Sequence, residues 1–145
     1  MSTYVSSDYQ APSPFAQSLL SVLPHLPPDT RSGLCLELLL PHGNVLKFVQ
    51  RALHLPANHQ IINDLFSQIV ILDAHGDRDA LDQLHRIADD GNSKAQYSLG
   101  LKYKSGWSSV TQDIEKARVY FQLAASQGHE ASQFLLDYMD AHQDT

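Results

Sequence analysis

Residues 91–128 read GNSKAQYSLGLKYKSGWSSVTQDIEKARVYFQLAASQG, and this stretch predicts two helices joined by a turn. The first helix, residues 94–104, has Ala95, Leu99 and Tyr103 at intervals of four, with Gly100 beside them. The second, residues 113–127, carries small and apolar residues at spacings that share one helix face: Ala117, Tyr120, Phe121, Ala124 and Ala125. Gly91 and Gly128 stand where helices are expected to end, since glycine adopts the left-handed backbone of a C-terminal cap. The stretch therefore predicts a helical hairpin.

The hairpin resembles the Sel-1-like repeat, a relative of the tetratricopeptide repeat. The residues that fall on the family pattern are Ala95, Leu99, Gly100, Tyr103, Gly106, Val110, Asp113, Lys116, Ala117, Tyr120, Ala124, Ala125 and Gly128. The chain departs from the pattern after Gly106, where Trp107, Ser108 and Ser109 replace the second loop glycine and lengthen the loop by a residue. We therefore expect an altered turn from which Trp107 stands out.

An internal repeat extends the resemblance to about residues 77–140. A shift of 37 residues places Ala80 on Ala117, Leu84 on Phe121, Ala88 on Ala125, Gly91 on Gly128, Gln96 on Gln133, Tyr97 on Phe134 and Leu99 on Leu136. The helix predicted at residues 77–90 is thus the second half of a preceding unit, and residues 58–74 are its expected first half. The last helix, 130–141, begins a following unit, and its expected apolar face holds Ala131, Phe134, Leu135, Tyr138 and Met139.

The N-terminal part predicts three further helices without a repeat signature. They are expected after Ser13 as a cap (to Leu23), after Asp29 as a cap (to Leu40), and from Asn44 to His54, and Asn58 is the expected cap of the helix that follows. The leucines of residues 34–40 predict burial nearly all round the second of these. Residues 1–12 lack any period and are expected to form a flexible arm. The prediction is one all-α domain over residues 13–145, with about eight helices: N-terminal helices at 13–57, and antiparallel hairpins of a short α-solenoid at 58–145.

Composition excludes several classes. The formal net charge is −6, which argues against a protein that binds nucleic acid through its phosphate backbone. The single cysteine, Cys35, rules out an internal disulfide and is expected to be a buried, inert thiol. No apolar run reaches the roughly 18 residues of a membrane-spanning helix. The first residues, MSTYVSSDYQAPSP, lack the pattern of a secretory signal, so a cytoplasmic location is expected.

The sequence offers no catalytic constellation. The metalloprotease motif H-E-x-x-H, the nucleophile elbow, the P-loop and the dinucleotide-binding glycine pattern are all missing. The eight histidines are interpreted as structural or solvent-exposed rather than as metal ligands, although His75, Asp77 and Asp79 form an imaginable ligand set. We therefore expect no metal, no cofactor and no enzymatic activity.

The resemblance implies protein–protein contact on a concave face lined by the first helix of each hairpin. Candidate contacts on the helix from Lys94 and in its loop lie outside the packing pattern: Gln96, Ser98, Leu101, Lys102, Lys104 and Trp107. Alternatively, Trp107 covers the lengthened turn and Leu101 packs on the preceding helix. The first hypothesis is a non-catalytic adaptor or regulator that binds an unidentified protein or peptide.

Two other functions stay open. One is a structural role in which short arrays self-associate, for instance as a homodimer. The other is a small hydrolase, since some relatives of this family have been associated with β-lactam binding or hydrolysis. Those relatives are exported and have paired cysteines in each repeat, and this chain has neither feature.

Overall fold

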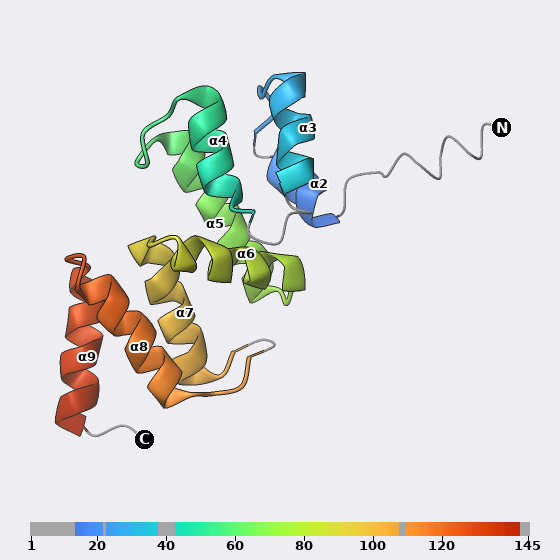
Figure 1. Ribbon diagram of the computed structural model, residues 1–145. Coiled ribbons are helices and arrows are strands. Elements are labelled where there is room, and N and C mark those ends of the chain that lie inside the picture. Colours follow the sequence, from blue (N-terminus) through green and yellow to red (C-terminus); the bar gives the residue numbers. More distant parts are fainter. Residues whose placement is uncertain (1–13, 22, 38–42, 108–109, 143–145) are drawn as a thin grey trace.

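The computed structural model describes residues 14–21, 23–37, 43–107 and 110–142. Every regular element in these ranges is a helix (Figure 1). The helices are α2 (Pro14–Ser21), α3 (Pro28–Glu37), α4 (Val45–Leu53), α5 (Gln60–Ala74), α6 (Arg78–Asp89), α7 (Ser93–Ser105), α8 (Ile114–Ala125) and α9 (Glu130–His142). The prediction of an all-α fold with helical-repeat hairpins is confirmed.

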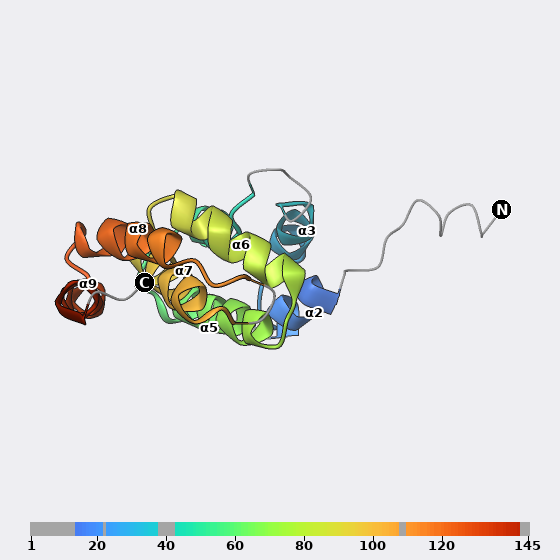
Figure 2. The same cartoon turned by 90° about the horizontal axis from the view of Figure 1, so that it is seen from below.

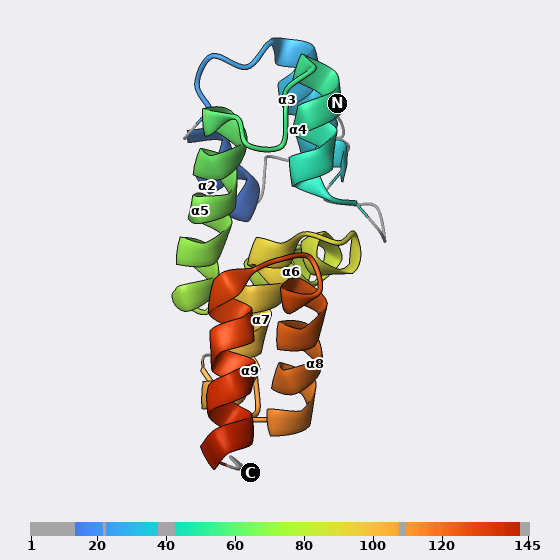
Figure 3. The ribbon, with the colours of Figure 1, turned by 90° about the vertical axis from the view of Figure 1, so that its left-hand side faces the viewer.

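The helices form two groups that follow the order of the chain. Helices α2 to α5 pack on one another at one end, and α6 to α9 continue from them toward the other end (Figures 1 and 3). One continuous apolar core runs through both groups, from Phe15 and Leu19 through Leu65 and Leu84 to Met139. The helices outside the repeat signature therefore share a core with the repeat.

Polar contacts join α6 to the start of α4. The buried Gln83 of α6 accepts a hydrogen bond from the Val45 amide at 3.2 Å and donates one to the Gly43 carbonyl at 3.1 Å. Asn44 caps α4 by accepting from the Leu46 and Lys47 amides, and its Nδ2 donates to Asp90 at 2.6 Å. These bonds fix the N-terminal group against the repeat, because an unpaired polar group at this depth would destabilise the fold.

The turns after α6 and α8 have the same backbone geometry. Gly91 has a φ of +99° and Gly128 a φ of +89°, the left-handed backbone expected at these two positions. Each glycine amide donates to the carbonyl three residues earlier, Ala88 or Ala125, at 2.9 Å. The next amide reaches the carbonyl of Ile87 or Ala124 in the same way. The shift of 37 residues found in the sequence is thus also a shift between equivalent hydrogen bonds.

Several local predictions are wrong. The cap of α5 is His59, whose Nδ1 accepts from the Ile61 amide at 3.1 Å, and not Asn58. Helix α3 begins at Pro28, so Asp29 lies in its first turn and is not its cap. Leu36 on α3 is exposed and Cys35 is half-buried, because α3 is covered by α2 and α4 on one side only. The expected cap Ser13, the arm at 1–12 and the leucines at 38–40 lie outside the described residues.

Candidate functional site

Lys102, expected at the binding surface, lies inside the protein. It is 3% exposed, and its Nζ forms an ion pair with Asp73 of α5 at 2.8 Å. Position 102 follows Ala95 and Leu99 at helical spacing, so it falls on a buried stripe of α7. Lys102 therefore links two helices, and its expected exposure was wrong.

Gln96 is also buried, at 3% exposure. Its Nε2 donates to the Ala88 carbonyl at 3.0 Å, and its Oε1 accepts from Gln127 at 3.0 Å. The side chain thus ties α7 to the end of α6 and to the turn after α8. Gln96 is a structural residue, and the expectation that it lies outside the packing is corrected.

The other four predicted contact residues reach the surface to different extents. Trp107 is 61% exposed, so the expectation that it stands out from the turn is confirmed. Ser98, Leu101 and Lys104 are half-buried. Leu101 packs against the core, which agrees with the alternative interpretation of that residue.

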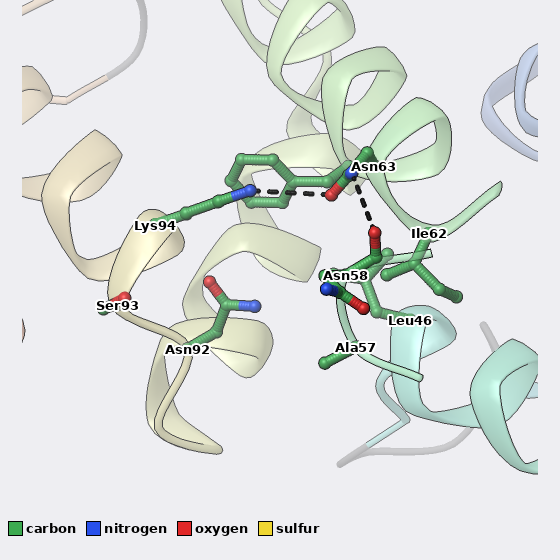
Figure 4. Close-up of a pocket in the computed structure, with 9 residues that line it drawn as sticks. Leu46, Ala57, Asn58, Ile62, Asn63, Asn92, Ser93 and Lys94 are labelled. Carbon is green, nitrogen blue, oxygen red and sulfur yellow. Dashed lines mark hydrogen bonds between the residues drawn. The ribbon is translucent and has the colours of Figure 1, made fainter. Parts of the chain in front are cut away.

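A cleft of about 230 Å³ lies where the N-termini of α5 and α7 meet the start of α4 (Figure 4). Four of its lining residues are apolar and five are polar. The apolar residues are Leu46, Ala57, Ile62 and Phe66, and the polar ones are Asn58, Asn63, Asn92, Ser93 and Lys94. This volume is below the roughly 300–1,000 Å³ of most small-molecule sites. The cleft is therefore sized for a few groups of a larger ligand.

Asn63 joins the two walls of the cleft. Its Nδ2 donates to the Asn58 carbonyl at 3.3 Å, and its Oδ1 faces Lys94 Nζ at 3.5 Å across the opening (Figure 4). Asn92 uses its Oδ1 to cap α7 through the Ala95 amide at 3.0 Å, so its NH₂ group is the part that can donate to a ligand. The cleft thus presents an amide and an ammonium group beside an apolar floor.

Sequence reasoning did not find this cleft. Its residues come from α4, the loop before α5, α5 itself and the start of α7. The one available signal was Lys94, an exposed cation in the first turn of α7, where a positive charge opposes the helix dipole.

The hairpin of α7 and α8 carries the resemblance to a known family. Gly100 lies so close to Phe121 that a Cβ atom at position 100 would be 2.5 Å from the ring. The Asp113 amide donates to the Tyr103 carbonyl at 2.8 Å and closes the loop, and Asp113 then caps α8 through the Lys116 amide at 3.0 Å. A comparison with protein-family models matches this segment to the Sel1 repeat, over residues 93–129. Residues 93–129 are thus similar to the Sel1 repeat.

The Sel1 repeat is in general a module for protein–protein interaction. The comparison with curated proteins and that with solved structures gave no match. The family match covers the α7–α8 hairpin, so the equivalence of α6 and α9 to repeat helices rests on the shift of 37 residues and on the matching turns.

Three rings form a cluster on the other side of the Sel1 repeat hairpin. His85 Nε2 lies 2.9 Å from the Tyr103 hydroxyl, while its Nδ1 lies 3.0 Å from the Leu81 carbonyl. Since a carbonyl only accepts, Nδ1 donates, and in the neutral ring Nε2 accepts from Tyr103. The rings of Tyr103 and Tyr120 stack with a centroid distance of 5.9 Å. Lys116 Nζ lies 4.8 Å from the centroid of the Tyr103 ring. The cluster joins α6, α7 and α8, and we interpret it as packing.

Burial raises the pKa of Tyr120 to about 12, with smaller contributions from Tyr103 and Asp89. In the unfolded chain this phenol titrates near 10. Between these values the unfolded state loses a proton that the folded state keeps, so stability is complete below pH 10 and falls as the pH rises toward 12. We expect Tyr120→Phe to reduce the loss between pH 8 and pH 11 by up to about 1 kcal/mol, because solvent screens a half-buried phenol. Urea denaturation of both proteins at pH 8 and pH 11 measures it, and equal losses would contradict the assignment.

The described residues contain no group of three or more His, Cys, Asp or Glu side chains arranged to hold a metal ion. Within the imagined ligand set, Asp77 caps α6 by accepting from the Ala80 amide at 3.0 Å. In the same described part of the chain, no helix has the length and apolarity to cross a membrane.

Proposed function

We propose that this protein is a non-catalytic adaptor or regulator that acts in the cytoplasm by binding a segment of a partner protein. The binding face runs along α7, from the cleft beside α5 to Trp107. The cleft carries the proposal, because it places an apolar floor, amide groups and the Lys94 ammonium side by side at one end of the Sel1 repeat.

The chemistry of this face suits a peptide segment. Side-chain amides both donate and accept hydrogen bonds, so Asn63 and Asn92 can bind main-chain groups of a partner. Lys94, Ser98 and Leu101 follow one another at helical spacing along α7 and lead from the cleft toward the loop. Trp107 supplies a large exposed aromatic surface near the far end, of the kind that dominates many interfaces.

We expect Lys94→Glu combined with Trp107→Ala to abolish partner capture while the protein stays folded. Both side chains are exposed, so the substitutions change the proposed face without touching the core. The tagged variant and the unchanged protein are compared by quantitative mass spectrometry after capture from native extract, with circular dichroism to confirm folding. A stoichiometric partner should fall by at least about tenfold in the variant, since losing a central contact costs more than about 1.4 kcal/mol.

The matched control is Lys47→Glu combined with Leu36→Ala, which makes the same kinds of change at exposed positions on α4 and α3. It should capture the partner as well as the unchanged protein does. Undiminished capture by the folded Lys94→Glu, Trp107→Ala variant would place the interaction on another face.

A further inference from the structure

Helix α9 occupies the repeat position of α7, but it is buried on one stripe where α7 is buried on two. The first buried stripe of α7 consists of Ala95, Leu99 and Lys102. Its equivalents on α9, Ser132, Leu136 and Met139, are buried as well. The second buried stripe of α7 is Gln96, Gly100 and Tyr103. Its equivalents Gln133, Asp137 and Asp140 are exposed. Figure 2 shows α9 at one end of the molecule, with α8 beside it.

Two aromatic side chains lie next to this exposed stripe. Tyr97 of α7 is half-buried, because its ring packs beside those of Phe121 and His129. The distances between ring centroids are 6.1 Å to Phe121 and 4.8 Å to His129. Its equivalent on α9, Phe134, is 68% exposed, and Tyr138 is 45% exposed. The expected apolar face of α9 is thus corrected: Ala131, Phe134 and Tyr138 lie outside, and the buried stripe is Ser132, Leu136 and Met139.

Asp137 prevents the repeat from continuing in its ordinary way. It stands at the position of Gly100, where the ring of Phe121 packs so closely that even a Cβ atom is excluded. A helix that packed on α9 as α8 packs on α7 would place its aromatic ring against the Asp137 carboxylate. That arrangement would bury an unpaired charge, which is strongly unfavourable.

We propose that the face formed by Phe134, Asp137 and Tyr138 of α9 docks an amphipathic helix of a partner protein that presents an arginine to Asp137. The three residues are spaced i, i+3 and i+4, so they form one contiguous patch. The patch lies on α9, away from the cleft and from Trp107, and its occupant is independent of the function proposed above.

Charge complementarity identifies the arginine. The carboxylates of Glu130 and Asp137 are exposed on α9, and Gln133 holds Asp137 by donating to its Oδ1 at 3.0 Å. Two basic side chains contact neighbours of these carboxylates: Arg118 of α8 pairs with Asp140, and the His142 ring stacks on Tyr138 with a centroid distance of 4.0 Å. A guanidinium group binds a carboxylate with paired hydrogen bonds and also stacks on aromatic rings, so it satisfies Asp137 and Phe134 together.

The experiment uses peptides with the sequence of α8. If such a peptide packs on α9 as α8 packs on α7, its residue 121 lies opposite Asp137. The probes are side-chain-stapled helical peptides of residues 112–127, one with the natural Phe121 and one with Phe121→Arg. Fluorescence anisotropy measures their binding to the whole protein, and amide chemical shifts locate it. We expect the arginine peptide to bind at least about tenfold more tightly, because its guanidinium group forms a charge-assisted hydrogen bond with Asp137.

Two variants make the test specific. Asp137→Gly should reverse the preference in favour of the phenylalanine peptide, because it restores the space that Gly100 provides in α7. Phe134→Ser combined with Tyr138→Ser should weaken both peptides, while Leu36→Ser, an equally exposed control on α3, should change neither. The proposal is overturned by equal affinities of the two peptides, by no binding at millimolar concentration, or by a homodimer in sedimentation that Phe134→Ser dissociates.

Discussion

Lys102→Glu is expected to unfold the Sel1 repeat region, with a loss of about 4 kcal/mol or more in the free energy of unfolding. Lys102 and Asp73 are both buried and their charged groups are 2.8 Å apart. Removing one partner of a buried ion pair costs about 3–5 kcal/mol, because the other charge stays buried without its opposite charge. Glutamate adds a second carboxylate at the same place. Since single domains are stable by about 5–15 kcal/mol, this substitution removes much of the total.

Urea denaturation followed by circular dichroism measures this effect. Lys47→Glu, the same exchange at an exposed position, should stay within about 0.5 kcal/mol of the unchanged protein. A second comparison separates charge from packing: Lys102→Met with Asp73→Leu should recover most of the loss, as apolar replacements of buried pairs are often neutral. Methionine is a reasonable choice, because Met139 occupies the equivalent repeat position in α9 and is fully buried. A folded Lys102→Glu protein of unchanged stability would contradict this role of the ion pair.

The Lys102 result also bears on how binding is tested. A Lys102 variant that failed to capture a partner would report unfolding rather than a lost contact. Lys94 and Trp107 are the informative positions, because both are exposed in the folded protein.

The hairpin could be predicted from the sequence because its determinants are local. Helical spacing and the glycines at 91 and 128 act within a few residues, and both were found in the structure. Lys102 was misplaced because it lies outside the pattern of packing residues that the resemblance gives. Its spacing from Ala95 and Leu99 already put it on the buried stripe. Helical spacing was the better guide than the family pattern at this position.

The cleft and the ends of the array depend on tertiary neighbours, which no local pattern contains. Asn58, Asn63 and Lys94 come together only because α5 and α7 lie side by side. Phe134 and Tyr138 match apolar positions of a repeat helix, yet they are exposed because no described helix covers that side of α9. Leu36 was wrongly expected to be buried. A run of leucines does not say how many sides of α3 have a neighbouring helix.

Phe121→Ala is expected to cost about 3–5 kcal/mol of stability and to reverse the effect of a substitution at Gly100. Phe121 is fully buried, and its ring lies 2.5 Å from the place a Cβ atom would take at position 100. In the unchanged protein, Gly100→Ala should therefore cost about 1–3 kcal/mol through overpacking. This occurs although alanine favours a helix interior by about 1 kcal/mol over glycine.

In the Phe121→Ala background the close contact is gone, and Gly100→Ala should become neutral or stabilising by up to about 1 kcal/mol. Urea denaturation of the four proteins gives the coupling between the two positions, with Val119→Ala, an exposed residue of the same helix, as the control. If Phe121→Ala does not fold, Phe121→Leu serves in its place. An equal cost of Gly100→Ala in both backgrounds would show that the ring does not set the requirement for glycine. It would also remove the reason for expecting Asp137, at the same position of α9, to exclude a helix that packs as α8 packs on α7.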